Sequence, residues 1–178
     1  MRPAPRLGIP EVKPAIESIR GRWVQKMSPK TVHSLLQGRL WGILQAWASS
    51  QAGYVGPEWR FYLLPLGEKP SSLVPDVAYV SRERLPREAG KLPQKPTIAP
   101  DIAVEILSPG DRKRLLNEKI ELYLANGAQL VVVVDPEDRR VELHECGLPV
   151  AVFREGSTAA TRAYRDLAID LAALFRDL

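Results

Sequence analysis

Apolar side chains recur at steps of three and four residues between positions 32 and 47, which predicts a helix over about 31–50. The stripe consists of Val32, Leu35, Leu36, Leu40, Ile43, Leu44 and Trp47. Ser28 and Pro29 are expected to cap and open this helix, because serine caps helix N-termini and proline suits the first turn. A short strand is expected just before it, over 23–27. A stripe of about four turns needs a large apolar surface to pack on.

Extended segments follow. Residues 53–66 are rich in aromatic and β-branched side chains interrupted by glycine, which predicts a hairpin. After a turn, a strand is expected over 73–80. Residues 82–100 are polar and contain several prolines, which is typical of a long loop. In 101–107 the apolar positions alternate, so the even positions share one face of a strand, while Asp101 and Glu105 share the other.

A second helix is predicted over 111–126, with Ser108 as its cap and Pro109 in its first turn. Residues 130–134 read LVVVV, a run that is typical of a strand buried on both faces. Strand 101–107, this helix and strand 130–134 form a βαβ unit, which favours parallel pairing and a right-handed crossover. The predicted fold class is therefore α/β, with both helices packed on a central mixed sheet.

Composition places limits on the class of protein. A chain of 178 residues, 45% of them hydrophobic and 26% charged, is expected to form one domain over 1–178. Four prolines predict a loose arm at 1–15, and a short amphipathic helix is expected to end the chain within 167–178.

The longest apolar runs have five residues, far below the roughly 18 of a membrane span. With no apolar leader and a single cysteine, Cys146, to which we assign no role, a cytoplasmic protein is expected.

The net charge of +4 is unevenly distributed, since residues 1–60 hold nine Lys and Arg against three Asp and Glu. This asymmetry is compatible with a polyanionic partner and equally with a solvated basic surface.

One set of residues suggests chemistry: Asp76, Asp101, Glu105 and Lys119. Adjacent strands lie roughly 5 Å apart, so one carboxylate from each of two strands can hold a hard divalent cation. Asp101 and Glu105 are roughly 13 Å apart along one strand and cannot share an ion, so one of them must pair with Asp76. The pattern leaves open which one. Lys119 lies within the apolar stripe of its helix, where it either extends to solvent or contacts an anion.

Other kinds of site find little support. Two histidines and one cysteine disfavour a zinc site, and glycine-rich phosphate loops are absent, so no nucleotide cofactor is expected.

These motifs resemble the Uma-type restriction endonuclease family, within the PD-(D/E)XK restriction-endonuclease-like superfamily. The similar segments are VPDVAYV (74–80), APDIAVEILSP (99–109), EKIELY (118–123), Gly127, VDP (134–136), MSP (27–29) with His33 after it, and LAALF (171–175). The resemblance covers nearly the whole chain. It implies a restriction-endonuclease-like fold, a central mixed β-sheet flanked by helices.

The resemblance also implies residue roles. Asp76 and Glu105 are the metal-binding carboxylates and Lys119 is the catalytic lysine, moved from the strand to the following helix. Leu107 occupies the position at which the superfamily carries its lysine. Arg22 stands where relatives are expected to carry Glu, so a supporting acid from that segment is expected to be missing.

The function expected is magnesium-dependent hydrolysis of DNA, with manganese as an alternative ion. Lys30, His33 and Arg39 are expected to contact nucleic acid. Leu107 and Arg22 motivate a first alternative, a nuclease-fold protein that binds nucleic acid or regulates without efficient cleavage. A second alternative is a structural protein in which the acids and Lys119 form a buried charge cluster. A homodimer is compatible with the sequence, and no membrane partner is expected.

Overall fold

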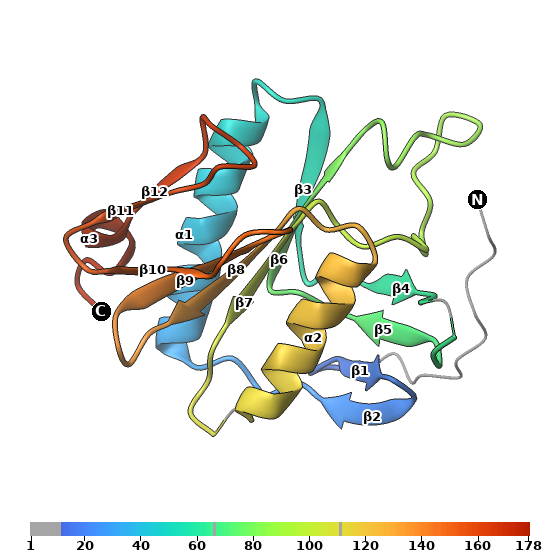
Figure 1. The fold of residues 1–178 in the computed structure, drawn as a ribbon, viewed down its shortest axis with the longest axis horizontal. Coiled ribbons are helices and arrows are strands. Elements are labelled where there is room, and N and C mark those ends of the chain that lie inside the picture. Colours follow the sequence, from blue (N-terminus) through green and yellow to red (C-terminus); the bar gives the residue numbers. More distant parts are fainter. Residues whose placement is uncertain (1–11, 66, 111) are drawn as a thin grey trace.

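The protein is described by a computed structural model over residues 12–65, 67–110 and 112–178. The strands are β1 (Ile16–Ile19), β2 (Arg22–Gln25), β3 (Gly53–Pro57), β4 (Phe61–Leu63), β5 (Ser71–Leu73), β6 (Val77–Ser81), β7 (Ile102–Ile106), β8 (Leu130–Asp135), β9 (Arg140–Glu145), β10 (Ala151–Arg154), β11 (Thr158–Ala160) and β12 (Ala168–Asp170) (Figure 1). The helices are α1 (Thr31–Ala48), α2 (Lys113–Ala125) and α3 (Leu171–Leu174). None of these three helices has the length and hydropathy of a membrane span.

A six-stranded mixed sheet, in the order β10-β9-β8-β7-β6-β3, forms the centre of the fold. β7 and β8 pair in parallel and are connected through α2, and the other neighbours pair antiparallel. The predicted βαβ unit and mixed sheet are therefore confirmed. Beside it lies a four-stranded antiparallel sheet, β2-β1-β5-β4, and β11 pairs with β12 as a separate ribbon.

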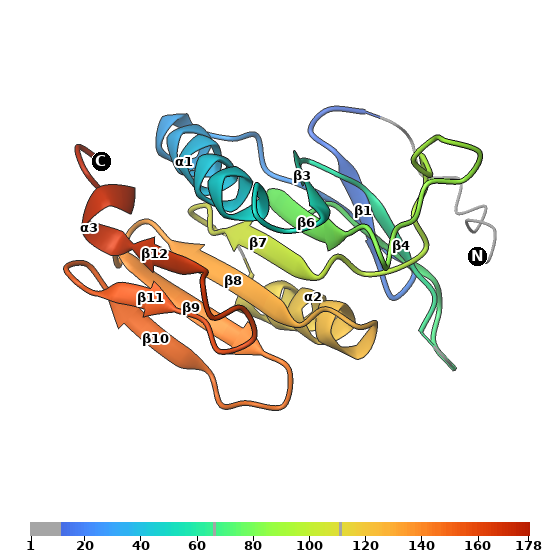
Figure 2. The ribbon, with the colours of Figure 1, turned by 90° about the horizontal axis from the view of Figure 1, so that it is seen from above.

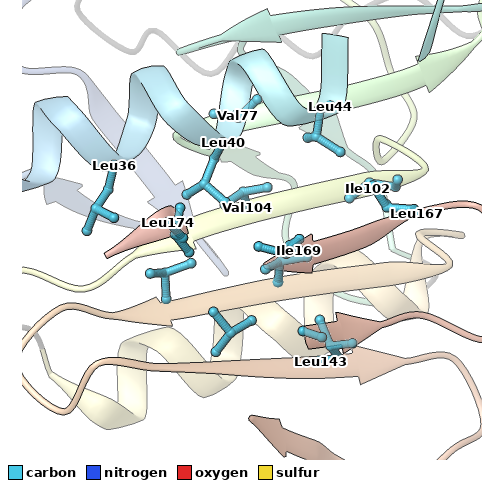
Figure 3. Packing of buried hydrophobic residues seen from close by; sticks show 14 of the residues in the cluster. Leu36, Leu40, Leu44, Val77, Ile102, Val104, Leu143, Leu167, Ile169 and Leu174 are labelled. Carbon is cyan, nitrogen blue, oxygen red and sulfur yellow. The ribbon is translucent and has the colours of Figure 1, made fainter. Parts of the chain in front are cut away.

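Helices α1 and α2 cover opposite faces of the central sheet (Figure 2). On the α1 face, Leu36, Leu40 and Leu44 pack over β6, β7 and β8 together with the C-terminal segment (Figure 3). On the α2 face, the alternate residues of the same strands pack with Ile120 and Tyr123. The apolar run of β8 follows from this arrangement, because each of its faces lies against a core.

The hairpin expected over 53–66 is wrong. β3 pairs with β6 in the central sheet, whereas β4 pairs with β5 in the four-stranded sheet. The strand expected over 73–80 is likewise divided, because Pro75 separates β5 from β6. Proline has no N–H for a sheet ladder, so the chain changes sheets at this point.

Both predicted helix caps are also wrong. The N-cap of α1 is Lys30 and that of α2 is Arg112, and neither makes a side-chain capping bond. The backbone is still extended at these residues, so each helix begins later than Ser28 or Ser108 predicts.

The ends of the chain differ from the prediction in part. A strand, β12, precedes the predicted C-terminal helix, which is reduced to α3, and the Asp170 side chain caps it by accepting from Ala172 N and Ala173 N. Most of the arm predicted at 1–15 lies outside the described residues.

The packing of α1 divides its predicted apolar stripe into two parts. Leu40 is 1% exposed and lies in the core, whereas Leu35 is 46% exposed. We expect Leu40→Ala to lower the free energy of unfolding by about 2–5 kcal/mol, and Leu35→Ala to change it by about 0.5 kcal/mol or less. Urea denaturation of both variants measures this difference. Equal losses would mean that α1 packs through a different face.

Candidate active site

Asp76 is positioned by the step from one sheet to the other. It lies between Pro75 and the first residue of β6, and its N–H donates to Val104 O at 2.9 Å. The register of β6 and β7 pairs Val77 with Val104, so Asp76 and Glu105 are the next residues along two neighbouring antiparallel strands. The choice that the sequence left open is thereby resolved, since Glu105, not Asp101, lies near Asp76.

The Asp76 carboxylate is 98% buried and fully engaged. Its Oδ2 accepts from Ile106 N at 2.7 Å, its Oδ1 accepts from Lys26 Nζ at 2.7 Å, and His33 Nε2 lies 3.4 Å from Oδ2. Burial alone would raise the pKa of Asp76, but the charge of Lys26 and the His33 contact hold it well below its usual value. Asp76 therefore remains an anion.

The Glu105 carboxylate faces α2. Its Oε2 accepts from Lys119 Nζ at 2.5 Å and its Oε1 accepts from Tyr123 OH at 2.8 Å. Lys119 Nζ also lies 3.1 Å from Oε2 of Glu17, whose Oε1 accepts from Val74 N at 2.7 Å. Burial raises the pKa of Glu105 to about 7, with Glu17 and Asp76 adding to the shift, although Lys119 opposes it.

Two lysines, the buried Lys119 and the partly buried Lys26, balance these acids. Lys26 Nζ donates to Asp76, to Val74 O at 2.9 Å and to Glu58 Oε1 at 3.1 Å. Burial would lower the pKa of both lysines, but the surrounding carboxylates raise it above the usual value. Both amines are therefore charged. We refer to Glu17, Lys26, Asp76, Glu105 and Lys119 as the charge cluster.

All five members of the charge cluster, together with His33, line one cavity of about 100 Å³. Two carboxylates on adjacent strands are a donor set that suits a hard divalent cation, which is often held by one or two carboxylates together with water and substrate oxygens. Among the described residues, no group of three or more His, Cys, Asp or Glu side chains forms a preassembled metal cage. The donor chemistry thus fits an ion shared between protein and substrate.

Comparison with known proteins identifies the family. A family model described as "Uma2: Putative restriction endonuclease" matches residues 7–172. The chain belongs to the Uma2 family. Five solved chains match it, among them a "putative nuclease belonging to DUF820 from Anabaena variabilis ATCC 29413", which is 28% identical with a TM-score of 0.85 over 95% of this chain and 94% of that chain. No curated protein matches. Family and fold confirm the predicted resemblance and fold class, and they indicate a nuclease of the restriction-endonuclease-like type.

Within this Uma2 protein, several residues singled out in the sequence lie away from the charge cluster. Asp101, at the other end of β7, accepts from Ser81 N at 2.7 Å and from Arg84 Nη1 at 3.0 Å. Arg39 Nη1 donates to the carbonyls of Leu174 and Arg176, both at 2.7 Å, and thereby ties α1 to the C-terminal segment. Lys30 lines a larger cavity beside the site.

Two members of the charge cluster in this Uma2 chain were missed by sequence reasoning. Glu17 on β1 contacts Lys119, whereas Arg22, the position at which an acid was expected to be missing, pairs with Glu118 of α2. An acid in the middle of a short strand, next to Ile16 and near Ile19, was the available signal for Glu17. Lys26 follows β2 and carries no such signal, since only the placement of the two sheets side by side brings it to Asp76.

Removing the Lys119 amine should destabilise this Uma2 protein, because Glu17 and Glu105 would then face each other without a cation. Lys119→Met is expected to lower the free energy of unfolding by about 3–5 kcal/mol. The control, Lys113→Met, alters an exposed lysine at the start of the same helix and should cost about 0.5 kcal/mol or less. Chemical denaturation at neutral pH measures both, and equal stability of the two variants would contradict the pairing described above.

The raised pKa of Glu105 predicts a pH dependence of stability. Between its ordinary value of 4.5 and about 7, the folded state holds a proton that the unfolded state has released, so wild-type stability falls as pH rises. Glu105→Gln lacks this proton. The stability of Glu105→Gln relative to wild type should therefore increase from pH 5 to pH 7, by about 1.4 kcal/mol per pH unit at most. Asp76, whose pKa is lowered, changes the pH dependence of stability only at more acidic pH. Parallel stability curves would refute the raised pKa.

Proposed function

We propose that this protein is an endonuclease that hydrolyses phosphodiester bonds in DNA with the help of a divalent cation, magnesium or manganese. The observation that carries the proposal is that Asp76, just before β6, Glu105 of β7 and Lys119 of α2 line one small cavity. Membership of the Uma2 family supports a nucleic-acid substrate.

Asp76 and Glu105 are the residues that would hold the cation. When bound, it would offset negative charge on the phosphate and lower the pKa of water. Both carboxylates are now paired with lysines, Asp76 with Lys26 and Glu105 with Lys119. Binding therefore requires the two amines to give up part of these contacts, and the freed amines are then close to the phosphate.

Lys119 is the residue that orients the attacking water and offsets the charge that develops on phosphate oxygens. Its amine approaches from the helix, which compensates for Leu107 at the usual lysine position of the strand. Tyr123, one helical turn later, donates to Glu105 and so limits the rotation of that carboxylate. Tyr123 is therefore a positioning residue.

His33 supports contact with substrate. Its Nε2 faces Asp76, and within the described part of the chain its buried Nδ1 has no hydrogen-bond partner. A phosphate or sugar oxygen would satisfy that atom. Lys30, exposed just before α1, supplies a phosphate contact nearby, whereas Arg39 is already bound to main-chain carbonyls.

Nicking of supercoiled plasmid tests the proposal. We expect nicking in magnesium or manganese and none in EDTA. Asp76→Asn, Glu105→Gln and Lys119→Ala should each reduce the rate by about 100-fold or more. The control, Glu121→Gln, alters an exposed acid of α2 outside the cavity and should retain the wild-type rate.

Three results would count against hydrolysis by this site. Undiminished nicking by Asp76→Asn would mean that the activity comes from elsewhere. Salt-sensitive DNA binding without cleavage would indicate a binding or regulatory protein on a nuclease fold. Failure of isothermal titration to detect any binding of manganese would indicate a closed, structural charge cluster.

A further inference from the structure

A second cavity, of about 530 Å³, adjoins the one that contains the charge cluster. His33, Leu107, Ser108 and Leu116 belong to the walls of both cavities. We propose that this larger cavity receives one unpaired nucleotide of the substrate, next to the phosphate to be cleaved. The preferred substrate is then single-stranded or locally unpaired nucleic acid. This inference rests on the proposed function, whose site it extends.

The sizes of the two cavities support this assignment. The charge-cluster cavity, about 100 Å³, has room for a phosphate group but not for a nucleoside. The larger cavity, about 530 Å³, falls within the roughly 300–1,000 Å³ that is typical of sites for small organic ligands. In a duplex the bases are stacked inside the helix, so a base enters such a cavity only from a single strand or after extrusion from the stack.

The walls of the larger cavity match the chemistry of a nucleotide. Val32, Leu107, Leu116 and Pro136 provide apolar surface against which a base could pack. Val32 is 39% exposed, so its side chain presents accessible apolar surface at this cavity. The apolar wall favours an uncharged flat group, the base, over a second phosphate.

Two lysines, at the starts of α1 and α2, favour an anionic chain at the rim of this cavity. Arg140 is paired with Asp135 at 3.1 Å, and Arg139 with Glu155 at 2.7 Å, so these arginines are already neutralised. Lys30 and Lys113 are exposed, and no ion pair to either is found among residues 12–65, 67–110 and 112–178. They stand at the starts of α1 and α2 and are suited to the phosphates on either side of the inserted nucleotide.

Binding of fluorescein-labelled DNA in EDTA tests the proposal without cleavage. The ligands are a 12-nucleotide single strand, the blunt duplex of the same sequence and that duplex with one unpaired nucleotide. We expect the single strand and the interrupted duplex to bind at least about tenfold more tightly than the blunt duplex. Val32→Asp should weaken single-strand binding by about tenfold or more. Leu35→Asp places the same charge one turn further along α1, outside the cavity, and should have less than about a threefold effect.

Preference for the blunt duplex, or equal losses from Val32→Asp and Leu35→Asp, would overturn the assignment of the cavity. These outcomes are independent of plasmid nicking. Metal-dependent nicking combined with tight duplex binding leaves the proposed function intact and refutes the cavity proposal. Cavity-dependent binding of single strands without any nicking supports the cavity proposal and refutes the proposed nuclease function.

Discussion

The mutual neutralisation of buried charges is the interaction on which this site depends. Glu17, Asp76 and Glu105 are all at most 6% exposed, and an isolated carboxylate at such a depth would be strongly disfavoured. Lys119 and Lys26 make these positions tolerable by contacting the acids at 2.5–3.1 Å. A protein built for stability alone would gain by replacing such a network with apolar side chains. That the chain carries it supports a use for the charges.

Topology brings these charges together. The parallel pairing of β7 with β8 requires a crossover, and α2 is that crossover, so the Lys119 face of the helix packs over the Glu105 face of β7. Pro75 lies between β5 of the four-stranded sheet and β6 of the central sheet. Asp76 follows it and therefore lies at the start of the central sheet. Glu17 and Lys26 reach the charge cluster because β1 and β2 belong to the same four-stranded sheet as β5, the strand that precedes Pro75. The four-stranded sheet thus contributes Glu17 and leads into Lys26, while the central sheet positions Asp76 and Glu105.

Local patterns were enough to predict the centre of the fold and part of the site. The alternation in 101–107, the apolar run of β8 and the helix between them predicted the crossover. The place of Lys119 in an apolar stripe left two alternatives, an amine in solvent or an amine in contact with an anion, and the structure shows the second. Register is invisible in one sequence, so the partner of Asp76 could not be chosen. The 53–66 segment was misassigned because strand propensity does not state which sheet a strand joins. Lys26 reaches Asp76 across 50 residues, a contact that no local pattern encodes.

We propose that the Asp76 and Glu105 carboxylates bind one divalent cation in exchange for part of their lysine contacts. A crystal structure of the protein soaked in manganese, with anomalous scattering recorded, measures this directly. We expect an anomalous peak within about 2.5 Å of oxygens from both side chains. Crystals in which Lys26 and Lys119 keep both carboxylates, with no peak between them at saturating manganese, would contradict it.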